Sequence, residues 1–144
     1  MIEFNEKVNE IFAKHTSYYF KVNDNSLESK GSKQGLDFTI TKKSTGYQLE
    51  PERLSGFESA ILSLAINYSA LSLSTTSQCS MLMVDESFDC IDEEKFVSEL
   101  PSILETLKMF YRSVVIISHR EIPPDAIDYK LKITHHGSFS EIGL

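Results

Sequence analysis

Two adjacent carboxylates, Asp85 and Glu86, come directly after the apolar run Met81–Val84. Two such groups at the end of a buried strand are costly unless a cation or a reaction uses them. In nucleotide hydrolysis the first can hold Mg²⁺, and the second can orient or deprotonate the attacking water. The alternative is a solvated helix start, favoured by the helix dipole. That alternative explains the acidic residues 92–94 well and residues 85 and 86 poorly.

A second polar group, Ser118-His119-Arg120, also follows an apolar run, Val114–Ile117. A histidine at such a strand end can donate to a phosphate oxygen or position a water. A lone histidine there is more often structural. Its placement parallel to the acidic pair favours a functional interpretation of His119.

A third group, Ser55-Gly56-Phe57-Glu58, precedes a long uncharged stretch. Ser55 and Glu58 have the S-x-x-E spacing of a capping box, which is a purely structural helix start. The same helix N-terminus presents backbone N–H groups that suit a phosphate. Gly56 would allow a ligand to approach the backbone closely.

The N-terminal part of the chain is predicted to hold a helix and a small sheet. Phe4, Val8 and Ile11 recur at helical spacing, which fits an amphipathic helix or the end of a coiled-coil seam. Residues 18–22 read as a strand, residues 23–35 as a polar loop, and residues 36–49 as an antiparallel hairpin with one buried face.

The remainder predicts alternating helices and strands, and therefore a parallel sheet. A helix is expected from Ser55 to about Leu73, and residues 81–84 and 114–117 read as strands buried on both faces. Between them lies a helical segment in which Pro101 is expected to start a second piece. Residues 129–134 offer a third, alternating strand. In a strand–helix–strand crossover, chemistry is expected beyond the carboxyl ends of the strands, where the acidic pair and His119 lie.

Composition limits the classes of function. The 144 residues are 41% hydrophobic and 24% charged, which fits one globular domain. A formal charge of −7 argues against broad binding to a phosphate backbone. Two cysteines in no zinc spacing favour an intracellular, reducing compartment. The 26 uncharged residues from Ser59 to Val84 include eleven Ser, Thr, Asn or Gln residues, so an amphipathic core helix leading into a polar loop is expected there, and no membrane association.

Together and in this order, the motifs resemble the C-terminal half of an ABC-type ATPase head, and more narrowly the SMC family with its double-strand-break-repair relatives. Residues 54–58 resemble the signature motif LSGGE, residues 81–86 Walker B, residues 87–92 the D-loop, and residues 114–119 the switch-histidine motif. The resemblance implies an α/β fold with a mainly parallel sheet, flanking helices, and an N-terminal helix plus β-hairpin. It also implies that residues 1–17 end a returning coiled-coil helix, residues 18–50 form the small sheet, and residues 51–144 carry the motifs.

The resemblance also implies a role for each matching residue. Glu86 would be the catalytic base, Asp85 would serve Mg²⁺, and His119 would sense the γ-phosphate of ATP. Ser55 and Gly56 would contact ATP held by an opposing head, and Asp92 would act across the head dimer. The expected cofactors are ATP and Mg²⁺.

The expected partners follow from one gap in the pattern. No glycine is followed by lysine, so the chain has no phosphate-binding P-loop and is not expected to hold ATP alone. In SMC-type proteins this loop lies in an N-terminal lobe beyond a long coiled coil, so the chain resembles a C-terminal lobe, excised or separately encoded. Its partners would be that lobe, a second head, DNA through the assembled complex, and a nuclease or kleisin subunit, in DNA repair or chromosome organisation.

Two alternatives stay open. The chain could be the nucleotide-binding domain of another ABC family, or a degenerate head that binds a partner without hydrolysing ATP. Phe57 replaces the second signature glycine, and a bulky ring near the phosphate position would favour the degenerate head. His135 and His136 are adjacent in an alternating strand, so their side chains point oppositely and are taken as structural or surface groups.

Overall fold

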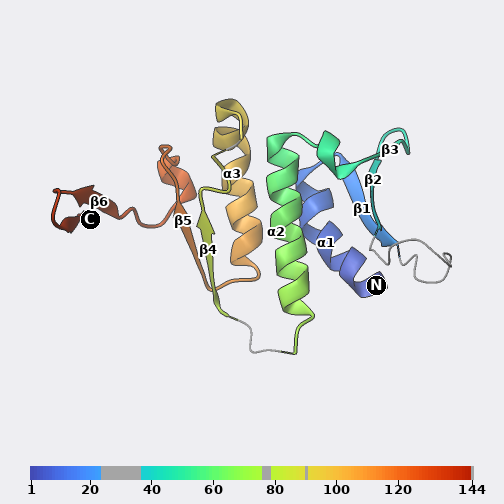
Figure 1. The fold of residues 1–144 in the computed structure, drawn as a ribbon, viewed down its shortest axis with the longest axis horizontal. Coiled ribbons are helices and arrows are strands. Elements are labelled where there is room, and N and C mark those ends of the chain that lie inside the picture. The colour runs from blue at the N-terminus through green and yellow to red at the C-terminus, as the bar shows by residue number, and fades with distance from the viewer. Residues whose placement is uncertain (24–36, 76–78, 90, 144) are drawn as a thin grey trace.

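The fold of this computed structural model is described for residues 1–23, 37–75, 79–89 and 91–143 (Figure 1). The predicted loop between the first two strands, with Leu36, lies outside the described residues, as do Cys90 and part of the loop after residue 72. The main elements run α1, β1, β2, β3, α2, β4, α3, β5, β6 and β7, with short 3₁₀ turns at Pro51–Arg53 (η1) and Pro124–Ala126 (η2).

The structure of residues 2–23 and 37–49 confirms the predicted helix and small sheet. α1 covers Ile2–His15, and the antiparallel sheet has the order β1 (Tyr18–Asn23), β2 (Asp37–Lys42) and β3 (Gln48–Leu49). Val8, Ile11 and Phe12 of α1 are fully buried. The helix therefore buries an amphipathic face against the rest of the molecule.

α1 also pairs with the edge of the small sheet through two asparagines one helical turn apart. The Asn9 side-chain amide donates to Phe20 O and accepts from Phe20 N, both at 2.8 Å. Asn5 makes the same pair of bonds with Val22. These amides satisfy the backbone groups of β1 that face away from β2, as an added strand would.

α2 covers Gly56–Ser72 and lies between α1 and α3 (Figure 1). Its start confirms the predicted capping box: Ser55 N donates to Glu58 Oε2 at 2.8 Å, and Glu58 N donates to Ser55 Oγ at 3.4 Å. Phe57, Ile61 and Ala65 bury the inner face of the helix. The uncharged stretch is thus a core helix, and no helix in the described part of the chain is long and apolar enough to cross a membrane.

β4 (Met81–Asp85), α3 (Glu93–Lys108) and β5 (Ser113–Ile117) form the predicted strand–helix–strand unit. The two strands pair in parallel, from Met81 opposite Ser113 to Asp85 opposite Ile117. The expectation of a mainly parallel sheet holds for this pair alone, since the other two sheets of the described residues are antiparallel.

Burial on both faces of these strands is a wrong prediction. Val84 is buried and its neighbours on the same face, Leu82, Val114 and Ile116, are partly buried. The other face exposes four apolar side chains, which we call the open face: Met81, Met83, Val115 and Ile117, exposed by 48%, 59%, 38% and 43%. The cause is that α2 and α3 cover one face, and no described element covers the other.

The expectation that Pro101 starts a second helical piece is also wrong. α3 is continuous from residue 93 to 108 with Pro101 inside it. Proline removes the hydrogen bond that Val97 O would accept. Val97 is 51% exposed, and a carbonyl on the solvent side of a helix can bind water instead.

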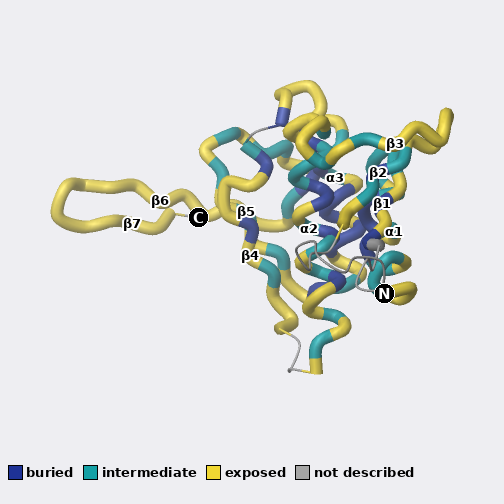
Figure 2. The backbone as a smooth tube through the Cα atoms, turned by 45° about the vertical axis from the view of Figure 1, so that its right-hand side comes forward, coloured by how far each residue is buried: buried dark blue, intermediate teal, exposed yellow. Residues whose placement is uncertain are grey.

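The third strand differs from its prediction in extent and pairing. β6 covers Lys132–His135 and pairs antiparallel with β7 (Ser140–Gly143) instead of joining the parallel sheet. This hairpin projects from the body and is exposed along its length (Figure 2). The expectation of surface histidines for His135 and His136 is confirmed here: both are exposed, and their side chains contact Ser140, Glu141 and Phe139 of the same hairpin.

The end of α1 is fixed to α3 by a shared hydroxyl. Lys14 Nζ and His15 Nε2 each lie 2.9 Å from Oγ1 of the buried Thr106. Since Thr106 donates to Ser102 O, it accepts from both partners. Burial, and secondarily the charge of Lys14, lower the pKa of His15, which favours the neutral ring that donates through Nε2.

Candidate functional site

The acidic pair lies at the turn that leaves β4. Glu86 N donates to Ile117 O at 2.9 Å, which extends the parallel ladder by one bond beyond Asp85. The Glu86 backbone then takes a left-handed conformation, with φ of 51°. A residue with a Cβ pays about 1–2 kcal/mol for that conformation. Strain of this kind is concentrated at functional sites.

His119 lies directly against this turn. Its Nε2 is 2.8 Å from Glu86 Oε1, and the two side chains are 84% and 55% exposed. The structure therefore brings the predicted base and the predicted sensor into contact, because β4 and β5 end side by side. The expectation of buried carboxylates is wrong, since both Asp85 and Glu86 are exposed at the edge of the open face.

The segment after Glu86 is anchored from both sides. We call Glu86–Asp89 and Ile91–Asp92 the acidic loop, and Ser118–Arg120 the histidine loop. Phe88 and Ile91 are each 2% exposed and anchor the acidic loop in the core. Ser118 Oγ donates to Asp89 Oδ1 at 2.7 Å, and Arg120 reaches the carbonyls of Asp89 and Ile91. Sequence analysis assigned no role to Ser118, Asp89 or Arg120.

Ser55 and Gly56 lie at the start of α2, at the end of the molecule where β4 and β5 finish (Figure 1). Both are exposed. Phe57, the residue next to Gly56, is 6% exposed and packs in the core, and Lys95 Nζ lies 5.5 Å from its ring centroid. The outer surface at the start of the helix is therefore formed by Ser55 and Gly56, not by the Phe57 ring.

Asp92 is the N-cap residue of α3 and is exposed. Its side chain makes no cap hydrogen bond, whereas its carbonyl accepts from Phe96 N at 2.8 Å. The structure places Asp92 at the far end of the acidic loop from Glu86. Within the described residues, no hydrogen bond or ion pair joins Asp92 or Ser55 to the Glu86–His119 pair.

The donor set suits Mg²⁺ held mainly by a substrate. No group of three or more His, Cys, Asp or Glu side chains in the described residues could enclose a metal ion. Mg²⁺ in phosphoryl-transfer sites is usually held by one or two carboxylates together with waters and substrate phosphates. Asp85, exposed at the carboxyl end of β4, fits that arrangement.

The fold identifies a class of architecture: it is similar to that of SMC-type ATPase heads. A scan against protein-family models finds no match. Solved structures supply the likeness, at 17–20% identity, and each match covers 99% of this chain. At that identity the likeness concerns the fold.

Three of these structures show how far the likeness in fold extends. One, from work on ATP-driven dimerisation and DNA-stimulated activation of SMC ATPases, has a TM-score of 0.72, is 17% identical and is covered over 83% of its length. The Smc head of Pyrococcus furiosus with an extended coiled coil, bound to the C-terminal domain of ScpA, has a TM-score of 0.66 at 20% identity, over 34% of its length. The SMC head of Thermotoga maritima has a TM-score of 0.59 at 19% identity, over 45%.

A sequence relative is found in a giant virus. The uncharacterised protein R555 of Acanthamoeba polyphaga mimivirus is 31% identical over 149 residues, which cover 94% of this chain and 10% of that protein. The chain thus spans about a tenth of the length of this curated relative.

Proposed function

We propose that this chain is the C-terminal lobe of an SMC-like ATPase head, and that it supplies the catalytic carboxylate and the trans-acting signature for ATP-dependent head dimerisation. Residues 1–17 end the returning coiled-coil helix, residues 18–50 form the small sheet, and residues 51–144 carry the motifs. The observation that carries the proposal is the contact of Glu86 with His119 at the carboxyl end of a parallel strand pair.

In the proposed reaction, water attacks the γ-phosphorus of ATP and Glu86 accepts the proton that this water loses. The bond between the γ-phosphorus and the bridging oxygen breaks, and its electron pair leaves with ADP. His119 contacts the Glu86 carboxylate through Nε2, and with nucleotide bound the same N–H could turn from Glu86 to a γ-phosphate oxygen. Asp85 would hold Mg²⁺, which supplies charge neutralisation at the phosphates.

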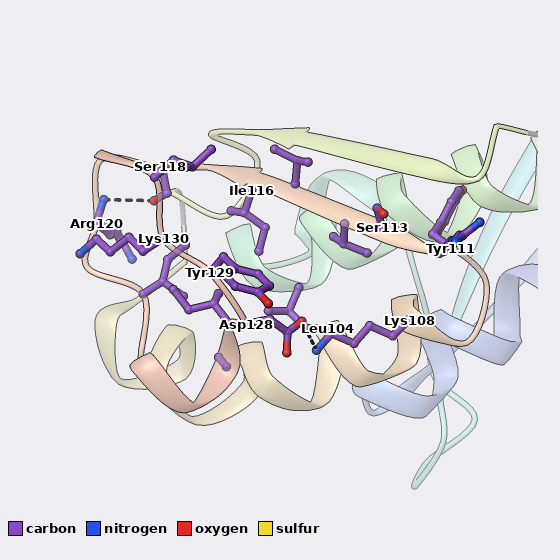
Figure 3. Close-up of a pocket in the computed structure, with 17 residues that line it drawn as sticks. Leu104, Lys108, Tyr111, Ser113, Ile116, Ser118, Arg120, Asp128, Tyr129 and Lys130 are labelled. Atoms are coloured by element: carbon purple, nitrogen blue, oxygen red, sulfur yellow. Dashed lines mark hydrogen bonds and ion pairs between the residues drawn. The ribbon is translucent and has the colours of Figure 1, made fainter. Parts of the chain in front are cut away.

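The open face supports an assembly with a second, P-loop-bearing lobe. Monomeric proteins rarely expose contiguous apolar patches of this kind, and a strand pair with open edges can accept further strands. A hollow of about 700 Å³ also lies beside β5, between residues 113–116 and residues 126–131 (Figure 3). Strands from that lobe would pair with the open edge, and other elements of the same lobe would cover the open face.

The signature residues support a role in trans. Ser55 and Gly56 are exposed at the N-terminus of a 17-residue helix, which favours anions. Their exposure at the start of α2 would let them contact ATP bound on an opposing head. Asp92, exposed at the end of the acidic loop, would act across the same dimer.

The fold also suggests the larger assembly. The Pyrococcus furiosus neighbour is a head bound to ScpA, so a kleisin-type subunit is the partner we propose, with a nuclease as the counterpart in a repair complex. With a formal charge of −7, the chain would meet DNA through the assembled complex. The role is DNA repair or chromosome organisation in an intracellular compartment.

The burial of Phe57 favours the catalytic head over the degenerate one, because a ring packed in the core leaves the helix start open to a phosphate. The other alternative, a nucleotide-binding domain of a different ABC family, predicts the same chemistry with another partner lobe.

The test is a paired measurement on the head reconstituted from this chain and a P-loop lobe. Glu86→Gln keeps the shape of the side chain but cannot take the proton, so the ATPase rate should fall by about 10²- to 10⁴-fold. The MgATP-dependent dimer should accumulate, because the bound state is no longer dissolved by hydrolysis. Asp85→Asn should weaken MgATP binding itself.

Glu94→Gln is the matched control, because Glu94 is an exposed carboxylate in the first turn of α3. It should leave both the rate and the dimer fraction unchanged. Normal hydrolysis by Glu86→Gln would overturn the catalytic assignment. An inactive Glu86→Gln head that also fails to dimerise would move Glu86 from chemistry to structure.

A further inference from the structure

Arg120 is the residue that ties the histidine loop to the acidic loop. Its Nη2 donates to Asp89 O at 2.7 Å, and its Nη1 donates to Ile91 O. Its guanidinium also stacks over the Phe96 ring in the first turns of α3, 5.5 Å from the ring centroid. The Arg120 side chain therefore binds two carbonyls of the acidic loop and also contacts the helix that follows this loop.

Ser118 completes the same connection from the other side of His119. Its hydroxyl donates to Asp89 Oδ1 at 2.7 Å and accepts from Arg120 N at 3.0 Å. Ser118 and Arg120 are partly buried, whereas His119 between them is exposed. The two neighbours thus hold the loop by its buried side and present the imidazole outward.

These contacts form a closed network that includes Glu86 and His119. Asp89 N donates to Glu86 O at 2.9 Å, and Glu86 Oε1 meets His119 Nε2 at 2.8 Å. From His119 the chain leads to Arg120, and Arg120 returns to Asp89. A displacement of the acidic loop therefore moves the Glu86 carboxylate and the imidazole together.

We propose that Arg120 is a positioning residue for the hydrolysis described above: it makes the acidic and histidine loops one rigid body, and so couples the position of Asp92 at the dimer interface to the Glu86–His119 pair. This inference rests on the proposed function. The chemical reason is specific to arginine, because a planar guanidinium presents two parallel donors to two carbonyls. A lysine keeps the charge but is a single point donor.

The experiment compares Arg120→Gln, Arg120→Lys and Ser118→Ala in the reconstituted head, with Lys42→Gln as control, since Lys42 is an exposed cation on the distant β2. Misplacement of reacting groups can cost about 10²-fold in rate. We expect Arg120→Gln to lower kcat by up to about 10²-fold while the KM for ATP changes by less than about threefold. Arg120→Lys should recover part of that loss, and Lys42→Gln should match the wild type.

A double-mutant cycle separates positioning from general destabilisation. If Arg120 acts through the pair, Arg120→Gln added to His119→Ala should slow the head little beyond His119→Ala alone, because residues that act as a unit are strongly non-additive. Losses that multiply, or a fall in MgATP affinity as large as the fall in kcat, would overturn the inference. Thermal unfolding of each variant checks the fold. If Arg120→Gln fails to fold, Ser118→Ala tests the same network of contacts.

The two proposals fail differently. Unchanged kcat in Arg120→Gln, with Glu86→Gln inactive, overturns the positioning role and leaves the proposed function standing. Normal hydrolysis in Glu86→Gln overturns the proposed function itself.

Discussion

Glu86 combines an exposed acidic side chain with a left-handed backbone, at φ of 51°. Glycine adopts this conformation at little steric cost, whereas glutamate does not. Its contact with His119 returns little stability, since exposed ion pairs contribute about 0–1 kcal/mol. Backbone strain without a compensating stabilising contact is the pattern expected of a residue kept for its chemistry.

A pair of substitutions at this position measures the strain. Both Glu86→Gly and Glu86→Ala remove the carboxylate, but only glycine relieves the backbone. We therefore expect Glu86→Gly to have the higher free energy of unfolding, by about 1 kcal/mol, in urea denaturation of the chain. The same pair at Glu94, in the first turn of α3, should show the opposite order, because glycine weakens a helix. Equal stabilities of the two Glu86 variants would contradict the strain.

At the scale of elements, the sequence predicts what local patterns encode. The capping box at Ser55 and Glu58, the helix around Val8 and Ile11, and the parallel pairing of the two apolar runs are all confirmed. Each depends on neighbours close in the sequence or on a regular period. Local propensity and hydrophobic period therefore account for most of the elements.

Contacts between distant residues were not predictable in this way. Asn5 and Asn9 pair with the β1 edge across 17 and 11 positions, and Arg120 reaches Asp89 across 31. The local pattern carries little that distinguishes these residues from solvated ones. The Asn-x-x-x-Asn spacing on one helix face was the available signal for the first contact. Arg120 carried no signal beyond its place next to His119.

Pro101 shows how context overrides propensity within an element. α3 continues through it because Phe96, Leu100 and Ile103 bury a continuous face on both sides of the proline. Pro101→Ala should therefore raise the free energy of unfolding by about 2 kcal/mol: the helix regains about 3 kcal/mol, and a freer unfolded chain offsets up to about 1 kcal/mol. Urea denaturation measures the change. Ser102→Ala, one residue further on, should gain no more than about 0.5 kcal/mol, and a destabilised Pro101→Ala would contradict this account.

At the scale of the whole molecule, the chain has a well-packed half and an open half. α1, α2 and α3 enclose a continuous core, whereas the strand pair and the β6–β7 hairpin lie toward the outside (Figure 2). Asp85, Glu86 and His119 follow the strands of that open half, whereas Ser55, Gly56 and Asp92 lie at the starts of α2 and α3. Under the proposed function, the second lobe would dock on this open half.

The last prediction tests the open half. Met83→Lys and Ile117→Lys, combined, place two charges on the open face, where both side chains are already exposed. The chain should keep its thermal stability, because exposed positions tolerate charge. Binding to the P-loop lobe should weaken by about 10²-fold or more, since burying an unpaired charge in an apolar interface costs several kcal/mol.

Isothermal titration calorimetry of the chain with that lobe measures the loss. Met109→Lys is the control, because Met109 is 73% exposed at the end of α3 and outside the open face. It should bind like the wild type. If the double variant binds the lobe with undiminished affinity, the lobe does not cover the open face. If the double variant loses its own thermal stability, then that face is already packed within the chain, and the apolar strands need no partner.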